Sequence, residues 1–155
     1  MLENLSLADN KGKPFGWASG EQKADRLLPL RAGRPGPGLE DKLDVKMGAL
    51  SGGQRQAVAL LMATMTPLKF LILDEHTAAL DPKTAETIMV LTGKVVKEKG
   101  LTALMVTHNL RYAVEYGDRL LMLDHGKIVL DRAGAEKAAT STEELLAIFN
   151  RYSVM

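Results

Sequence analysis

The residues best suited to chemistry lie in two short strings, Leu50–Gln56 and Phe70–Glu75. In the first string, Ser51 is a good helix N-cap, and Gly52 and Gly53 follow it. A helix that begins there presents uncovered backbone N–H groups and the positive end of its dipole, which favour a bound phosphate. The glycines allow the ligand to approach closely, and Gln54 can add a polar contact. On this string alone, an ordinary helix cap followed by flexible glycines remains an alternative.

The second string is an apolar run that ends in two adjacent carboxylates, Asp74 and Glu75. The run predicts a buried parallel strand, and open α/β sheets place their ligands at the carboxyl ends of such strands. One carboxylate can hold Mg²⁺, directly or through water, and its neighbour can act as a general base toward water. A solvated acidic turn after a core strand is the structural alternative.

Two further residues could take part in the same chemistry. His108 follows a second apolar strand, Thr102–Val106, and can bridge a phosphate oxygen and a catalytic carboxylate. Asp81 precedes Pro82 and is expected to cap a helix. We expect His76 to shape the turn after Glu75, and His125 to be a hairpin residue.

The composition is that of an ordinary globular domain of 155 residues, with 46% hydrophobic and 25% charged residues. The formal net charge of +1 gives no electrostatic argument for binding nucleic acid. The chain has no cysteine, which excludes disulfides and thiolate metal sites and fits a reducing compartment. No secretory signal or membrane span is evident, so we expect a soluble cytoplasmic protein.

The elements that must position these residues alternate along the chain. Helices are expected over Gly53–Met65, from Pro82 to Gly100, and over about Asn109–Tyr116. Leu120–Leu123 and Lys127–Leu130 predict a hairpin, and Ser141–Glu144 is a capping box that opens a last helix. The first forty residues are rich in Gly and Pro and are expected to be peripheral, with a short helix over Glu21–Leu30. This order predicts an α/β fold with a mostly parallel sheet and flanking helices.

The motifs and their order resemble those of the nucleotide-binding subunit of ATP-binding cassette (ABC) transporters. Leu50–Gln54 match the signature motif and Phe70–Asp74 the Walker B strand. Glu75 falls on the catalytic glutamate, Ala79–Asp81 on the D-loop and His108 on the switch histidine. Histidine at position 76, where the wider family usually has proline, resembles a bacterial importer subset.

The resemblance implies a P-loop NTPase-like fold that is incomplete, with part of a helical signature subdomain over residues 1–66 and part of the ATPase core over residues 67–155. It implies catalytic roles for Glu75 and His108 and a metal-binding role for Asp74. Ser51, Gly52, Gly53 and Gln54 would contact ATP held by a second subunit, with Asp81 in the D-loop.

The phosphate-binding loop of such enzymes is absent from this sequence. It needs Gly-x-x-x-x-Gly-Lys-Ser/Thr, but Gly12-Lys13, Gly93-Lys94 and Gly126-Lys127 are followed by Pro, Val and Ile. The family's adenine-stacking aromatic and its Q-loop glutamine have no counterpart either. Because the P-loop supplies most phosphate contacts, we expect the chain alone neither to bind ATP tightly nor to hydrolyse it. Loss of the P-loop strand should also uncover apolar sheet surface and favour self-association.

The resemblance implies ATP and Mg²⁺ as cofactors, a second nucleotide-binding subunit in a head-to-tail dimer, a membrane permease subunit and a place on the cytoplasmic face of the membrane. The chain would then be part of a subunit that drives solute uptake. The alternative is a non-catalytic accessory protein that lends its signature motif in trans to an intact cassette. A chromosome-maintenance or repair ATPase is disfavoured by the absence of sustained coiled-coil heptads and by the near-neutral charge.

Overall fold

The computed structural model describes residues 39, 42 and 44–153. The short helix expected over Glu21–Leu30 lies outside these residues. The chain forms two compact units, with the boundary between Leu104 and Met105. The expected division into part of a helical subdomain over residues 1–66 and part of the ATPase core over residues 67–155 stays a prediction.

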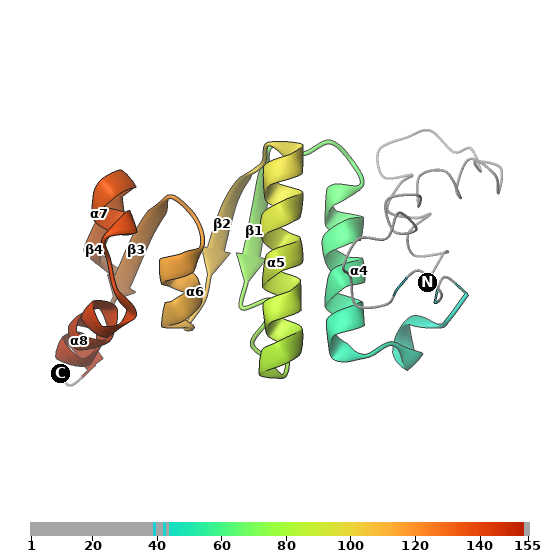
Figure 1. Ribbon diagram of the computed structural model, residues 1–155, viewed down its shortest axis with the longest axis horizontal. Helices are drawn as coiled ribbons and strands as arrows, with labels where there is room; N and C mark the ends of the chain where they lie inside the picture. The colour runs from blue at the N-terminus through green and yellow to red at the C-terminus, as the bar shows by residue number, and fades with distance from the viewer. Residues whose placement is uncertain (1–38, 40–41, 43, 154–155) are drawn as a thin grey trace. The chain divides into compact units, whose positions relative to one another are not determined.

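The described residues form helices and strands in the predicted alternating order (Figure 1). They are η1 (Met47–Ala49), α4 (Gly52–Thr64), β1 (Phe70–Asp74), α5 (Pro82–Lys99), β2 (Thr102–Val106), α6 (Leu110–Glu115), β3 (Arg119–Asp124), β4 (Lys127–Ala133), α7 (Gly134–Ala138) and α8 (Thr142–Ser153).

The ends of α5 follow directly from its sequence. Asp81 has an extended backbone and its carboxylate accepts a hydrogen bond from Thr84 N–H, while Pro82 occupies the first turn, where its missing N–H costs nothing. At the other end Gly100 adopts the left-handed conformation, with φ 59° and ψ 40°. Its N–H bonds back to the carbonyls of Val96 and Lys97, which closes the helix.

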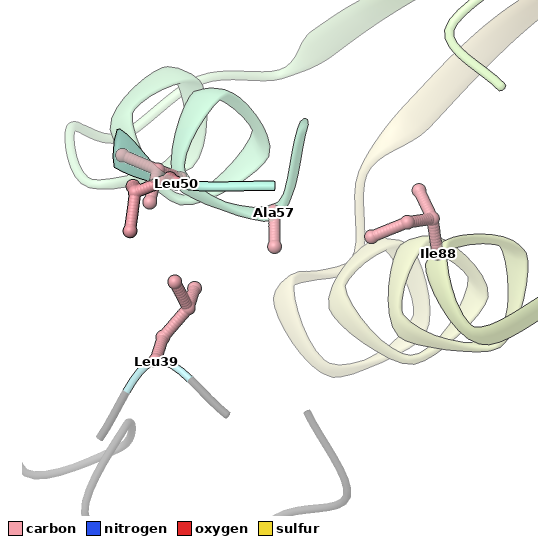
Figure 2. Close-up of a cluster of buried hydrophobic side chains, with 5 residues drawn as sticks. Leu39, Leu50, Ala57 and Ile88 are labelled. Carbon is pink, nitrogen blue, oxygen red and sulfur yellow. The ribbon is translucent and has the colours of Figure 1, made fainter. Parts of the chain in front are cut away.

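Helices α4 and α5 lie side by side and bury a common apolar cluster (Figure 1). The fully buried members come from three segments that are separated in sequence, and Figure 2 shows four of them, Leu39, Leu50, Ala57 and Ile88. Val58 completes the cluster, and partly buried apolar side chains surround it. Burial of this kind supplies the main favourable term in folding, so the cluster fixes the start of α4 against α5.

Strands β1 and β2 are neighbours in a two-stranded sheet and run in the same direction (Figure 1). In β1, Leu71 and Leu73 are buried, but Phe70 is 52% and Ile72 is 63% exposed. In β2, Leu104 and Val106 are 46% and 47% exposed. The expectation of two buried strands is therefore wrong: successive side chains point to opposite faces, and these four apolar residues are left uncovered.

The second unit is built on an antiparallel hairpin of β3 and β4. The turn residues His125 and Gly126 have φ 44° and 75°, as a two-residue hairpin turn of the type I′ class requires. Across the strands, the Arg119 guanidinium donates two hydrogen bonds to the Asp131 carboxylate, at 2.9 and 2.7 Å. The predicted hairpin and the place of His125 within it are confirmed.

Short helices complete this unit. Asn109 caps α6 by accepting hydrogen bonds from the N–H groups of Arg111 and Tyr112, at 3.1 and 3.3 Å. Ser141 Oγ accepts from Glu144 N–H at the start of α8, as the capping-box pattern predicts. Helix α7 is absent from the expectations, since its sequence Gly-Ala-Glu-Lys-Ala carries no side-chain cap and too few apolar residues to show a period. Among the described helices, none has the length and apolarity needed to cross a membrane.

Candidate functional site

The turn that opens α4 is a complete capping box. Ser51 Oγ accepts a hydrogen bond from Gln54 N–H at 3.2 Å, and Gln54 Oε1 accepts one from Ser51 N–H at 3.0 Å. Ser51 itself is exposed and Gly52 is half-buried. The N-terminus of α4 is thus held in one conformation, with its cap residue Ser51 exposed.

Gln54 differs from its neighbours because its side chain is buried. Its Oε1 also accepts a hydrogen bond from Lys42 Nζ at 3.3 Å, so this oxygen has two donors within the chain. The predicted contact between Gln54 and a nucleotide stays a prediction. Within the described residues, the visible role of Gln54 is to fix the turn that presents Ser51.

The two signature glycines lie against the segment that carries Asp81. A Cβ placed on Gly52 would lie 3.1 Å from Leu80 Cδ2, and one on Gly53 would lie 2.1 Å from Thr84 Cγ2. Distances below about 3 Å are not found between real side chains, so any other residue at position 53 would collide with Thr84. The sequence predicts these glycines from ligand access alone, and this second reason for them is visible only in the packing.

Asp81 is exposed and holds the N-cap of α5. Hydrogen bonds from the Thr84 side chain and from the Thr84 backbone N–H lower the pKa of its carboxyl group, so it is ionised at neutral pH. Of the predicted residues, the structure therefore brings the Ser51–Gln54 turn and the Leu80-Asp81 segment together at the starts of two neighbouring helices.

Asp74 and Glu75 follow β1 as predicted, with Asp74 exposed and Glu75 half-buried. Glu75 has φ 44°, a left-handed backbone that is unfavourable for a residue with a Cβ. Strain of this kind is concentrated at functional sites. The described part of the chain contains no group of three or more His, Asp or Glu residues able to hold a metal ion. The metal-binding role expected for Asp74 stays a prediction.

The turn after Glu75 is anchored to α5. His76 Nε2 lies 3.3 Å from Thr92 Oγ1, whose hydroxyl donates to the carbonyl of Ile88 at 2.8 Å. Since that hydroxyl proton is already engaged, His76 must donate through Nε2–H. Burial lowers the pKa of His76, and the nearby Glu75 carboxylate only partly opposes this effect. The expected role of His76 in shaping this turn has support, whereas Thr92 carried no signal in the sequence.

His108 lies in the second compact unit, in the segment between β2 and α6, and its side chain is exposed. Next to it, Thr107 Oγ1 accepts a hydrogen bond from Asn109 N–H at 3.1 Å, which leads the chain into the cap of α6. The switch role expected for His108 stays a prediction.

Comparisons with known proteins agree with this arrangement of motifs. The sequence profile described as "ABC transporter" matches residues 2–78. A tyrosine transport ATP-binding protein of Clostridioides difficile (strain R20291) is 49% identical over 150 residues, which cover 96% of this chain and 59% of that protein. A thiamine import ATP-binding protein of Jannaschia sp. (strain CCS1) is 43% identical over 145 residues, covering 94% of this chain and 60% of that protein. The chain thus spans about three fifths of the length of these relatives.

A solved structure has the same fold. It is a dimeric ATP-binding cassette described as a post-hydrolysis state with ADP and Pi, and it matches with a TM-score of 0.67 and 34% identity. The match covers 85% of this chain and 55% of that one. The family profile, the relatives and the fold all lead to one assignment: this chain belongs to the ATP-binding cassette family, with the P-loop NTPase-like α/β fold of its cassettes.

Proposed function

We propose that this chain is part of the ATP-binding subunit of an ABC importer and that it supplies the signature surface that covers ATP on a second cassette. The observation that carries the proposal is the exposed Ser51 at the N-terminus of α4, held by the capping box and set beside the Asp81 segment. Such a helix start binds phosphate through backbone N–H groups and the helix dipole.

The remaining candidate residues would take part in ATP hydrolysis rather than in covering the ATP of a second cassette. Glu75, at the end of β1, is suited to orient and deprotonate an attacking water, and His108 to contact the γ-phosphate. Asp74 would act as one ligand, direct or through water, of a Mg²⁺ ion that the nucleotide itself carries. Because the sequence contains no P-loop, these residues need a phosphate cradle supplied from outside its 155 residues.

The partners and the solute follow from the relatives, and they are proposals for this chain. The relatives are named for tyrosine transport and thiamine import, which favours a small-solute importer with a membrane permease. The matching cassette structure is a dimer with ADP and Pi, which favours a second cassette, ATP and Mg²⁺. A subunit of this kind would work on the cytoplasmic face of the membrane.

A second function is open, in which the chain is a non-catalytic accessory protein that lends its Ser51 surface to an intact cassette. This alternative rests on the same exposed Ser51 at the N-terminus of α4. The two functions differ in one respect. Only the subunit uses the Glu75 carboxylate, whereas both use the Ser51 turn.

The first experiment tests the Ser51 turn, which both functions use. A cassette with its own P-loop, but with its signature serine replaced by arginine, is assayed for ATP turnover with and without this chain. Addition of the chain should restore turnover, and Ser51→Arg should abolish the rescue. Gly48→Ala, a change into open space, is the matched control and should rescue like the unmodified chain. No rescue by the unmodified chain would overturn the proposal.

A second experiment separates the two functions. The chain is expressed together with the part of the tyrosine-transport relative that lies outside the matched region, about two fifths of that protein. The subunit function predicts Mg²⁺-dependent turnover that Glu75→Gln lowers by about 10²-fold or more. Turnover that does not depend on Glu75 would favour the accessory function. The chain alone should show no turnover, and measurable activity that Glu75→Gln removes would contradict that expectation.

A further inference from the structure

The starts of α4 and α5 are in close contact where Thr84 occupies the space that a side chain at position 53 would need. The methyl group of Thr84 lies only 2.1 Å from the position of a Cβ on Gly53. Thr84 belongs to the first turn of α5, and Gly53 to the first turn of α4. The contact therefore joins the capped N-terminus of α4 to the capped N-terminus of α5.

Thr84 is held from its other side by Asp81. Its N–H donates to Asp81 Oδ1 at 3.0 Å, and its side chain also lowers the pKa of the Asp81 carboxyl group. The hydroxyl thus faces the Asp81 cap, while the methyl group occupies the space that a Cβ on Gly53 would need. Rotation about χ1 would break one contact to relieve the other, so the side chain has little freedom.

A second contact runs in parallel with the first. Leu80, in the D-loop segment, lies 3.1 Å from the position of a Cβ on Gly52, and it packs against the apolar cluster between the helices. Both signature glycines are thus matched to residues that flank Asp81 in sequence. A shift of the α4 N-terminus would have to displace Thr84, Leu80 or both.

We propose that Thr84 is a positioning residue that couples the Ser51–Gln54 turn to the Asp81 loop, so that the two present one rigid surface to a nucleotide-bearing partner. This inference rests on the proposed function for its purpose, but the coupling itself can be measured without nucleotide. Thr84 would act through Gly53 and Asp81 and would not touch the nucleotide.

The coupling is tested first by a double-mutant cycle in thermal unfolding of the full chain. Gly53→Ala should lower the unfolding midpoint by about 3–10 °C, although alanine is a better helix former than glycine. Thr84→Ser, which removes the methyl group and keeps the hydroxyl, should cost less by itself and should recover most of the loss in the double variant. Gly48→Ala should leave the midpoint unchanged, since nothing lies within 4 Å of its Cβ.

A second measurement distinguishes positioning from packing, by following the Asp81 carboxyl group in an NMR pH titration. Thr84→Val keeps a methyl group beside Gly53 and removes the hydroxyl, so the pKa of Asp81 should rise toward its ordinary value. Thr84→Ser should leave that pKa low. Gly53→Ala should raise it, because displacement of Thr84 weakens both hydrogen bonds to Asp81.

Additive effects in the unfolding cycle, or an Asp81 pKa that Gly53→Ala does not move, would overturn the inference. The role in nucleotide contact is tested in the rescue assay with the signature-defective cassette, where Thr84→Val should lower kcat at least threefold with little change in KM. If the unmodified chain gives no rescue, the proposed function fails, while the unfolding cycle and the titration still decide the coupling. If rescue occurs and Thr84→Val leaves kcat unchanged, the positioning role is overturned and the proposed function stands.

Discussion

At the scale of single residues, the backbone conformation of Glu75 is the feature that the sequence around it predicts least. A left-handed φ of 44° at a glutamate has a cost of the order of 1–2 kcal/mol relative to a relaxed backbone. The His76–Thr92 hydrogen bond and the turn bond from Ala78 N–H to the Glu75 carbonyl, at 3.0 Å, hold this conformation. The chain thus keeps a carboxylate where glycine would be more stable, which fits a functional residue.

This gives a prediction on stability. Glu75→Gly should raise the free energy of unfolding by about 1 kcal/mol or less relative to Glu75→Gln, because glycine relieves the strain but gains entropy when unfolded. Both variants lose the charge, so their difference contains no contribution from it. Urea denaturation of the two proteins measures it. A glycine variant less stable than the glutamine variant would show that the φ of Glu75 carries no strain.

Residue types predicted the place of the site better than the direction of its side chains. Ser51 and Asp81 cap their helices as their types and positions indicate. Gln54 was expected to be available to a ligand, but its side chain is buried and its oxygen accepts from Ser51 and Lys42. The capping-box bond from Ser51 N–H, three residues away, and the bond from Lys42 Nζ together hold this oxygen inside the chain.

At the scale of elements, the packing of α4 against α5 depends on few large side chains, of which Ile88 is fully buried (Figure 2). Ile88→Ala should destabilise the protein by about 2–5 kcal/mol, through lost burial and the cavity that remains. Val90→Ala is a control on the same helix. Val90 is 54% exposed, so its removal should change the free energy of unfolding by less than about 0.5 kcal/mol. Equal effects in urea denaturation would contradict the assigned core.

The hairpin of β3 and β4 contains an ion pair whose contribution to stability should depend on pH. Hydrogen bonds from Arg119 lower the pKa of the Asp131 carboxyl in the folded protein. Asp131 therefore contributes stability that is fully present above its unfolded pKa of about 3.9 and is lost as the pH falls through the lower folded value. The effect should be small, since both side chains are exposed. Thermal unfolding between pH 6 and pH 2.5 measures it.

Two variants serve as controls for the acid dependence assigned to Asp131. Asp131→Asn and Arg119→Gln each break the pair, so both should flatten the acid dependence of the midpoint by a similar amount. The double variant should behave like either single one, because residues that share one interaction are not additive. An acid dependence that survives in both single variants would assign the effect to other carboxylates.

At the scale of the whole molecule, the uncovered sheet surface is the most consequential feature. Phe70 and Ile72 on β1, and Leu104 and Val106 on β2, leave apolar side chains exposed in two adjacent strands. The relatives have about two fifths of their length outside the region that this chain matches. Exposed apolar patches of this kind mark surfaces that associate.

We therefore expect self-association of the purified chain that increases with concentration. Ile72→Lys should weaken it severalfold, because a charge on the sheet face opposes burial. Val90→Lys places the same charge on an exposed position of α5 and should have little effect. Sedimentation velocity over a tenfold concentration range measures both. A monodisperse monomer throughout that range would contradict the expectation.

The sequence by itself determined the family, the order of elements and nearly every helix start, since caps, turn glycines and proline act through contacts within a few residues. Ser51, Asp81-Pro82 and Gly100 are the clearest cases. The tertiary structure alone decided which faces of β1 and β2 are covered, that Gly53 is matched to Thr84, and that Lys42 bonds to Gln54. These features depend on residues distant in the chain, whose approach is set by the packing of α4 on α5 and leaves no local pattern in the sequence.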